Sequence, residues 1–234
     1  MKFPHLSIPK RHSRHSSGSL HTRIECRCCL RLPAARAVQN RRAILSYEIR
    51  ATLARCEGRP ARITSLASGP ARELFDLYAR IDEPRAILST LIDFDREALD
   101  YCATESTRAG IGDLVTLVNA NLIHVAVGHR TLELAPQDLV YSIGLIDYFD
   151  DRLVVKLLDF IHTILRPGGR VVVGNCHPRN PTRAVMDHIL AWPLIHRDER
   201  AMHALFRESA FRSDCTRIFY EPQAINLFAE CIKH

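Results

Sequence analysis

The stretch Ile63-Thr64-Ser65-Leu66-Ala67-Ser68-Gly69-Pro70-Ala71-Arg72-Glu73 decides the fold. Its first four residues are apolar or small and predict a buried strand, and the run from Leu74 to Tyr78 predicts a helix. A tight turn of small residues lies between them. A strand that turns sharply into a helix directs free backbone N–H groups at whatever lies above the turn, and small side chains let a ligand come close. The stretch therefore predicts an α/β unit with a ligand site at its turn.

A second strand is predicted from Ala86 to Ile92, and it ends in Asp93-Phe94-Asp95. In nucleotide-binding β-α-β units, an acid at this place accepts hydrogen bonds from the ribose hydroxyls, and the neighbouring apolar residue packs on the base. Asp93 and Phe94 are therefore candidate nucleotide-binding residues. Asp95 is expected to cap the helix that follows.

A third strand is predicted from Leu114 to Val118, and it ends in Asn119-Ala120-Asn121. Asn121, with Asn119 as second choice, is a candidate to accept a hydrogen bond from the amino group of a base. Since Asn is also a common turn residue, a purely structural role stays open. No element is predicted between Leu122 and Gln137.

The chain from Gln137 to Tyr148 predicts a buried strand that ends near Ser142. Apolar residues from Leu153 to Leu165 then recur at helical spacing. Arg166-Pro167-Gly168-Gly169 is expected to end that helix, because Gly tolerates a left-handed cap and Pro blocks continuation. A fifth strand is predicted from Arg170 to Val173.

The two ends of the pattern are an added helix and a strand pair. An amphipathic helix is predicted from Ala37 to Cys56, upstream of the first strand. Downstream, helices are predicted over Pro181 to Trp192 and Glu199 to Phe206. The last two strands, Thr216 to Tyr220 and Ile225 to Cys231, are joined by a short turn and must therefore be antiparallel.

In this order the motifs of residues 37–234 resemble those of class I S-adenosylmethionine-dependent methyltransferases. The resemblance implies a doubly wound, seven-stranded Rossmann-like α/β sheet with its last two strands antiparallel and a helical lid after strand five. The first motif departs from the family pattern acid-x-Gly-x-Gly-x-Gly. Ser65 stands at the acid position, Ala67 and Ala71 replace the outer glycines, and Gly69 remains. The two alanines are expected to fit if they keep negative φ.

The resemblance also implies S-adenosylmethionine as cofactor, methyl transfer by direct displacement, and no metal. The residues that match the cofactor site are Ser65, Ala67, Gly69, Asp93, Phe94, Asn119, Asn121 and Ser142. The catalytic candidates are His177, Tyr148 and Arg179. A carboxylate acceptor is already nucleophilic when ionised, whereas a hydroxyl acceptor needs a base, for which His177 is the best placed residue.

A narrower resemblance concerns the acceptor. Residues Gly174 to Arg183 and Leu194 to Arg197 are similar to bacterial enzymes that make 3-hydroxypalmitic acid methyl ester, a quorum-sensing signal. This implies a small-molecule acceptor, in particular a fatty acid carboxylate. Arginine can hold a carboxylate through two parallel hydrogen bonds, so Arg183 and Arg197 are expected to bind it, with Trp192 on the acyl chain. Ordinary core packing and solvated arginines are the equal alternative.

The charge of the chain is unevenly distributed. Residues 1–42 carry ten Lys/Arg against one acid, a net +9, and the remainder carries a net −3. The basic character therefore belongs to the N-terminal segment, which argues against nucleic-acid binding by the body. Residues 1–34 are expected to form a disordered basic arm before a domain at 35–234. No apolar run approaches the ~20 residues of a membrane helix, and a cytoplasmic location is expected.

The cysteines fall into two groups. Cys26, Cys28 and Cys29 lie in the arm, and their spacing matches no paired zinc site. The others occur singly in apolar surroundings and are expected to be buried and reduced.

Two further functions stay open at this point. Loss of two motif glycines is consistent with a non-catalytic cofactor-binding domain. The basic arm is consistent with an RNA methyltransferase that uses it on phosphates. The oligomeric state is not predicted.

Overall fold

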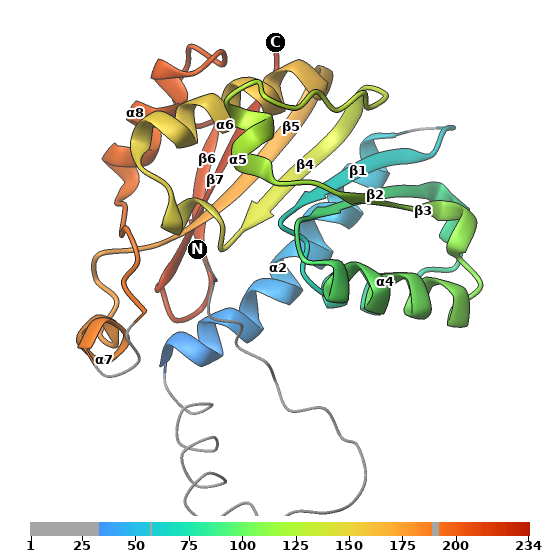
Figure 1. Cartoon of the computed structure of the whole chain (residues 1–234), viewed down its shortest axis with the longest axis horizontal. Helices are drawn as coiled ribbons and strands as arrows, with labels where there is room; N and C mark the ends of the chain where they lie inside the picture. The colour runs from blue at the N-terminus through green and yellow to red at the C-terminus, as the bar shows by residue number, and fades with distance from the viewer. Residues whose placement is uncertain (1–32, 57, 189–191) are drawn as a thin grey trace, which may run out of the picture.

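Strands and helices alternate along most of the computed structural model, which describes residues 33–56, 58–188 and 192–234 (Figure 1). The strands are β1 (Ala61–Leu66), β2 (Ile87–Asp93), β3 (Val115–Asn119), β4 (Gln137–Ile143), β5 (Leu165–Cys176), β6 (Arg217–Tyr220) and β7 (Asn226–Ile232). The helices are α2 (Pro33–Arg55), α3 (Arg72–Tyr78), α4 (Arg96–Arg108), α5 (Leu122–Ala126), α6 (Asp151–Ile164), α7 (Arg183–His188) and α8 (Glu199–Glu208). The expected arm and its cysteine cluster lie outside the described residues, except that residues 33–34 belong to α2.

All seven strands form one sheet in the order β3-β2-β1-β4-β5-β7-β6. The first five strands are parallel, and β7 runs antiparallel to both β5 and β6. This confirms the predicted Rossmann-like sheet with two antiparallel final strands. The strand order reverses between β1 and β4, which are neighbours in space but far apart in sequence. In such sheets, ligands bind beyond the carboxyl ends of the strands at this switch point.

Helices cover both faces of the sheet (Figure 1). One core cluster packs α2, α3 and α4 on one face, through residues such as Ile49 and Leu74. The other packs α5, α6 and α8 on the opposite face, through residues such as Leu157 and Phe206. Because both faces are covered, nearly all residues of the central strands β1 and β4 are buried. The cysteines of the described part that were predicted to be core residues are buried and unpaired, at Cys56, Cys102, Cys176, Cys215 and Cys231.

Acidic and amide side chains define where several helices begin. Asp95, Asp150 and Asp198 each accept hydrogen bonds from backbone N–H groups in the first turn of α4, α6 and α8. Such caps satisfy N–H groups that have no partner within the helix. The capping role predicted for Asp95 is thereby confirmed.

A buried ionic network fastens α2 to the sheet. Arg170 of β5 is 2% exposed, and its Nη1 lies 2.6 Å from the Glu48 carboxylate of α2 and 3.2 Å from that of Glu230 in β7. Arg217 of β6 binds the same two carboxylates at 2.6 Å each. Two positive and two negative charges therefore balance, and α2 is held across three strands.

The segment after β5 differs from the prediction of two lid helices. Of the helix expected over 181–192, the described residues show α7, and residues 189–191 lie outside the described part. Helix α7 begins at Arg183, because Asn180 Oδ1 turns the chain just before it by accepting the Thr182 N–H at 3.0 Å. Helix α8 is not a lid: Met202 and Phe206 belong to the core beneath it. In Figure 1, α7 lies apart from the layers, on the side where β5 ends. No helix within the described residues combines the length and hydropathy needed to cross a lipid bilayer.

Candidate active site

The carboxyl ends of β1 and β4 meet at the switch point of the sheet. The β1–α3 turn (residues 67–71) begins at the end of one strand, and Ser142 to Gly144 end the other. Ser142 is fully buried, and its Oγ donates to the Leu66 carbonyl at 3.1 Å, so it links the two strand ends. Its side chain therefore has a structural role, which leaves its backbone as the part that can face a ligand.

The β1–α3 turn keeps a glycine-type backbone although two of its glycine positions hold alanine. Ala67 has φ of 54° and Ala71 has φ of 43°, beside Gly69 at 51°. The condition under which the alanines were expected to fit, a negative φ, is therefore not met. Such a conformation costs an L-residue roughly 1–2 kcal/mol. The surrounding contacts enforce it: the Gly69 N–H donates to Asp93 Oδ2 at 2.7 Å, and the Ser68 N–H donates to the Ile92 carbonyl at 3.2 Å.

Replacing Ala67 with glycine should stabilise the protein. Removing the Cβ relieves the left-handed strain, and the greater freedom of glycine in the unfolded chain offsets part of that gain, which leaves about 0.5–1 kcal/mol. Urea unfolding measures the change. Ala103→Gly, inside α4, is the matched control and should lose about 1 kcal/mol. A loss of stability in both variants would contradict the strain at Ala67.

Asp93 ties the turn to the end of β2. It is 6% exposed; its Oδ2 accepts the Gly69 N–H and its Oδ1 accepts the Asp95 N–H at 2.9 Å. This is a structural role that the sequence did not reveal. Each carboxylate oxygen has a second acceptor site, so two further hydroxyl donors can still be bound. Phe94 next to it is 48% exposed, which is unusual for a large apolar side chain.

The two asparagines after β3 differ in how they are used. Asn119 Nδ2 donates to the Asp93 and Phe94 carbonyls at 3.2 and 2.9 Å, so its amide stiffens the end of β2. Asn121 is exposed and caps α5, because its Oδ1 accepts the Ile123 N–H at 2.9 Å. Both side chains keep acceptor capacity at the oxygen, and both remain candidates to bind an amino group.

Ser65, at the acid position of the first motif, is buried beside Tyr141 of β4. The acid in this region comes from α3 instead: Glu73 Oε1 accepts the Tyr141 hydroxyl at 3.0 Å. Burial raises the pKa of Glu73. The side chain of Ser65 therefore belongs to a buried polar cluster with Tyr141 and Glu73.

An arginine of α2 reaches the end of β4. A Cβ added at Gly144, whose φ is 82°, would lie 3.1 Å from Arg41 Nη1. The Arg41 charge lowers the pKa values of Glu73 and Asp147 against the stronger effect of burial. Burial raises the pKa of Asp147 to about 6, and its Oδ1 accepts the Cys176 N–H at 2.6 Å. Sequence reasoning missed Arg41, Glu73 and Asp147 as site residues, because their meeting depends on how α2 crosses the sheet.

His177 lies just beyond β5, is 3% exposed, and has contacts at both ring nitrogens. Nδ1 accepts the Arg179 N–H at 3.1 Å, and Nε2 lies 3.4 Å from the Glu199 carboxylate. The neutral ring then carries its proton on Nε2, toward Glu199. The Tyr220 hydroxyl also donates to Glu199 and, as the largest cause, holds its pKa at about 2. This arrangement orients the loop after β5 and leaves no ring nitrogen open to accept a proton from an acceptor.

Arg197 does not have the acceptor-binding role expected of it. It is 3% exposed, and its five N–H donors all have partners in the fold. They bind the Asp151 carboxylate, the Asn175 side chain and two backbone carbonyls at 2.6–2.9 Å. Because the guanidinium has no donor left, it cannot hold a further carboxylate. The sequence prediction for Arg197 is wrong.

The other two lid arginines lie at the surface. Arg183 pairs with Asp187 one helical turn on, at 3.4 Å. The side chain of Arg179 is 78% exposed and lies 3.6 Å from Glu199. Neither is brought to the ends of β1 and β4 by a contact of the described residues.

Tyr148, just after β4, and Trp192, after α7, are in direct contact. The indole N–H of Trp192 donates to the Tyr148 hydroxyl oxygen at 2.5 Å, and both side chains are half-buried. Burial is the main cause that raises the pKa of Tyr148. This pair links the segment after α7 to the turn after β4.

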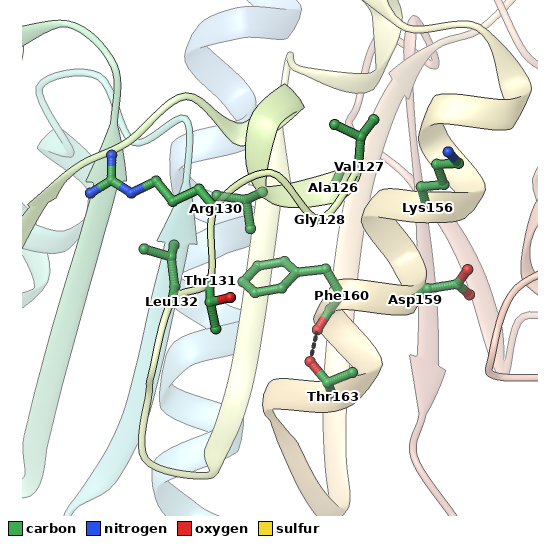
Figure 2. A pocket seen from close by; sticks show the side chains of 11 residues that line it. Ala126, Val127, Gly128, Arg130, Thr131, Leu132, Lys156, Asp159, Phe160 and Thr163 are labelled. Atoms are coloured by element: carbon green, nitrogen blue, oxygen red, sulfur yellow. Dashed lines mark hydrogen bonds between the residues drawn. The ribbon is translucent and has the colours of Figure 1, made fainter.

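A cavity of about 460 Å³ lies elsewhere, between the loop after α5 and helix α6 (Figure 2). Apolar side chains such as Leu132 and Phe160 form its floor, with Arg130 and Lys156 at its edges. None of the predicted site residues lines it. The cavity and the candidate site therefore share no predicted residue.

Comparison with known proteins identifies solved structures that share this fold. No protein-family model and no curated protein sequence matches the chain. A possible exported protein from Bordetella parapertussis has a similar structure, with a TM-score of 0.69 and 21% identity over 87% of this chain and 70% of its own. The S-adenosylmethionine-dependent methyltransferase SibL matches with a TM-score of 0.55 and 19% identity over 75% of this chain. An O-methyltransferase family 2 protein from Planctomyces limnophilus, in complex with apigenin, matches with a TM-score of 0.60 and 11% identity over 76%.

These likenesses concern the fold alone. The chain spans 51% of the length of each of the two methyltransferases. The strand order and the two antiparallel final strands are the Rossmann-like arrangement predicted from the sequence.

Proposed function

We propose that this chain is an S-adenosylmethionine-dependent methyltransferase that acts on a small molecule. The observation that carries the proposal is the turn at the switch point. Three of its residues, Ala67, Gly69 and Ala71, keep left-handed backbones although two are alanines. Strain of this kind persists where the surroundings enforce it, and it is frequent at ligand sites. The turn thus keeps its shape although two of its glycines are replaced, which argues against a non-catalytic cofactor-binding domain.

The residues around the turn fit this cofactor. A Cβ built on Gly69 meets no atom within 4 Å, so no described side chain packs against the turn at this point. Asp93 would hold the ribose hydroxyls through its remaining acceptor sites, and the exposed ring of Phe94 would cover the base. The oxygen of Asn121 or Asn119 would accept the adenine amino group. Asp93 and the asparagine would thereby bind the cofactor and keep the hydrogen bonds that they make within the protein.

In methyl transfer, the protein's part is to orient the acceptor and to keep water out. When bound, S-adenosylmethionine provides a methyl group activated by a sulfonium. The chain's own residues then orient the acceptor beside the end of β4 and exclude water. His177 is held by Arg179 N–H and Glu199, so it is poorly suited to take a proton from a hydroxyl acceptor. This supports an acceptor that is already ionised, and therefore a carboxylate.

The acceptor that we propose is a fatty acid, in particular a 3-hydroxy fatty acid, with a methyl ester as product. The half-buried Trp192–Tyr148 pair offers aromatic surface to an acyl chain next to the site. Exposed Arg179 and Arg183 remain candidates to attract the carboxylate from the surface. Incubation with labelled S-adenosylmethionine and a panel of 3-hydroxy fatty acids, simple fatty acids, phenols and RNA tests the class of acceptor.

The labelled product decides between the functions. Label in a base-labile methyl ester supports the fatty acid proposal. Label found only in a phenol contradicts the carboxylate acceptor, and label found only in RNA supports the RNA methyltransferase. No transfer to any acceptor, from a chain that binds the cofactor, supports the non-catalytic domain.

Replacing Asp93 with asparagine should weaken S-adenosylmethionine binding by about 1–3 kcal/mol, which is about 5- to 150-fold. The amide nitrogen cannot accept a ribose hydroxyl, and it also meets the backbone N–H of Gly69 or Asp95. Isothermal titration calorimetry measures the affinity. Asp100→Asn, on the exposed face of α4, is the control. Equal affinity in Asp93→Asn and the wild type would remove Asp93 from the site.

A further inference from the structure

Arg41 lies at the centre of the candidate site and has no bonding partner within the described part of the chain. Its Nη1 is next to Gly144 at the end of β4, where an added Cβ would lie 3.1 Å from it, a tight contact. Its charge acts on Glu73, Asp147, Tyr148 and Cys176, which surround it from α3, the turn after β4, and β5. None of them lies within ion-pair distance. A half-buried guanidinium whose N–H groups have no hydrogen-bond partner among the described residues can bind an anion.

Three other arginines of the candidate site, the lid and α2 each have a carboxylate partner in the fold. All five donors of Arg197 bind protein atoms, Arg183 pairs with Asp187, and the neighbouring Arg42 pairs with Asp76. Arg41 therefore differs from each of them in having a planar, charged fork available at the ends of β1 and β4. A carboxylate matches that fork through two parallel hydrogen bonds.

The position of Arg41 is fixed by the helix that carries it. Two turns further along α2, Glu48 is bound to Arg170 and Arg217 in the buried network. Asn40, one residue before Arg41, donates to Glu221 at 3.1 Å in the turn between β6 and β7. The helix is thus held on both sides of Arg41, and the guanidinium is aimed at the site by a rigid element.

We propose that Arg41 is the carboxylate-binding residue of this site, and this inference rests on the proposed function. Two carboxylates could occupy it: that of the methionine part of S-adenosylmethionine, or that of a fatty acid acceptor. Either bond would neutralise the guanidinium and would place the ligand beside Gly144, where β4 ends. The missing side chain of Gly144 leaves space for the guanidinium, and its φ of 82° independently favours glycine there.

The test measures binding and does not depend on turnover. Wild type, Arg41→Ala and Arg42→Ala are titrated by calorimetry with S-adenosylmethionine and with decarboxylated S-adenosylmethionine, which lacks only the carboxylate. In a second arm, with S-adenosylhomocysteine bound, the same proteins are titrated with decanoate and with decan-1-ol. Arg42→Ala is the matched control, since it removes an adjacent arginine whose partner is Asp76. If Arg41→Ala does not fold, Arg41→Gln takes its place.

The cofactor carboxylate is the ligand if Arg41→Ala weakens S-adenosylmethionine about tenfold or more and leaves the decarboxylated form within about twofold. The acceptor carboxylate is the ligand if decanoate alone is weakened. Equal loss for charged and uncharged partners, or no loss in either arm, overturns the inference while leaving the proposed function intact. If the wild type binds no S-adenosylmethionine, the proposed function fails separately. In that case, the inference is overturned as well if decanoate binds Arg41→Ala as tightly as the wild type, or if the wild type does not bind decanoate.

Discussion

Replacing Arg170 with alanine should lower the free energy of unfolding by about 3–5 kcal/mol. The substitution leaves the carboxylates of Glu48 and Glu230 buried with only Arg217 to balance them. It also removes the donor that binds Thr52 Oγ1 at 2.8 Å in α2. A buried charge without its partner is far more costly than the loss of a surface ion pair, so the effect should be among the largest in this protein.

Chemical denaturation measures this loss, and two variants calibrate it. Arg85→Ala breaks an exposed pair with Asp113 at 3.0 Å and should change stability by no more than about 0.5 kcal/mol. Arg170→Lys keeps the charge but loses the fork that reaches α2, and it should fall between the two. If Arg170→Ala and Arg85→Ala lose equal stability, the network does not hold α2 to the sheet.

Replacing Asp147 with asparagine should change how stability depends on pH. Burial raises the pKa of Asp147 from 3.8 to about 6 in the folded protein. Below pH ~4 the carboxyl is neutral in both the folded and unfolded states and contributes nothing. Between ~4 and ~6 the unfolded chain loses its proton first, so stability falls as pH rises. Above ~6 the full penalty is present, about 3 kcal/mol for two pKa units.

The asparagine variant does not titrate at this position. Its Oδ1 can still accept the Cys176 N–H, so the local hydrogen bond is preserved. Relative to the wild type, it should gain up to about 3 kcal/mol of stability between pH 4 and pH 8. Thermal unfolding across that range measures the difference, with the exposed Asp100→Asn as control. Parallel curves for wild type and Asp147→Asn would show that Asp147 is not held at a raised pKa.

The sheet could be predicted because local patterns specify it. The five parallel strands and the two final strands were predicted within two residues at most ends, since each is an apolar run bounded by turn residues. Strand β5 is the exception: it begins at Leu165 and includes Arg166-Pro167-Gly168-Gly169, because β4 pairs with this stretch through an irregular register at Gln137. Helix α5 has only five residues, too short for its periodicity to be recognised.

The site was harder to predict, because its contacts join residues far apart in sequence. Asp93 was found from its place at the end of β2, but its bond to Gly69 N–H could not be read from a pattern. The left-handed φ of Ala67 contradicts the usual preference of alanine and results from tertiary contacts. Arg197 was expected to bind the acceptor carboxylate or to be solvated, yet the turn after β4 surrounds it with acceptors. No motif of the sequence marks Arg41, which the path of α2 brings to Gly144.

Titration calorimetry of the intact chain with S-adenosylmethionine, and in parallel with NAD, tests the central claim most directly. The turn at residues 67–71, the Asp93 carboxylate and the exposed Phe94 ring together predict saturable binding of S-adenosylmethionine at one site per chain, with no binding of NAD. Binding of NAD in place of S-adenosylmethionine, or binding of neither by a folded chain, would contradict the account.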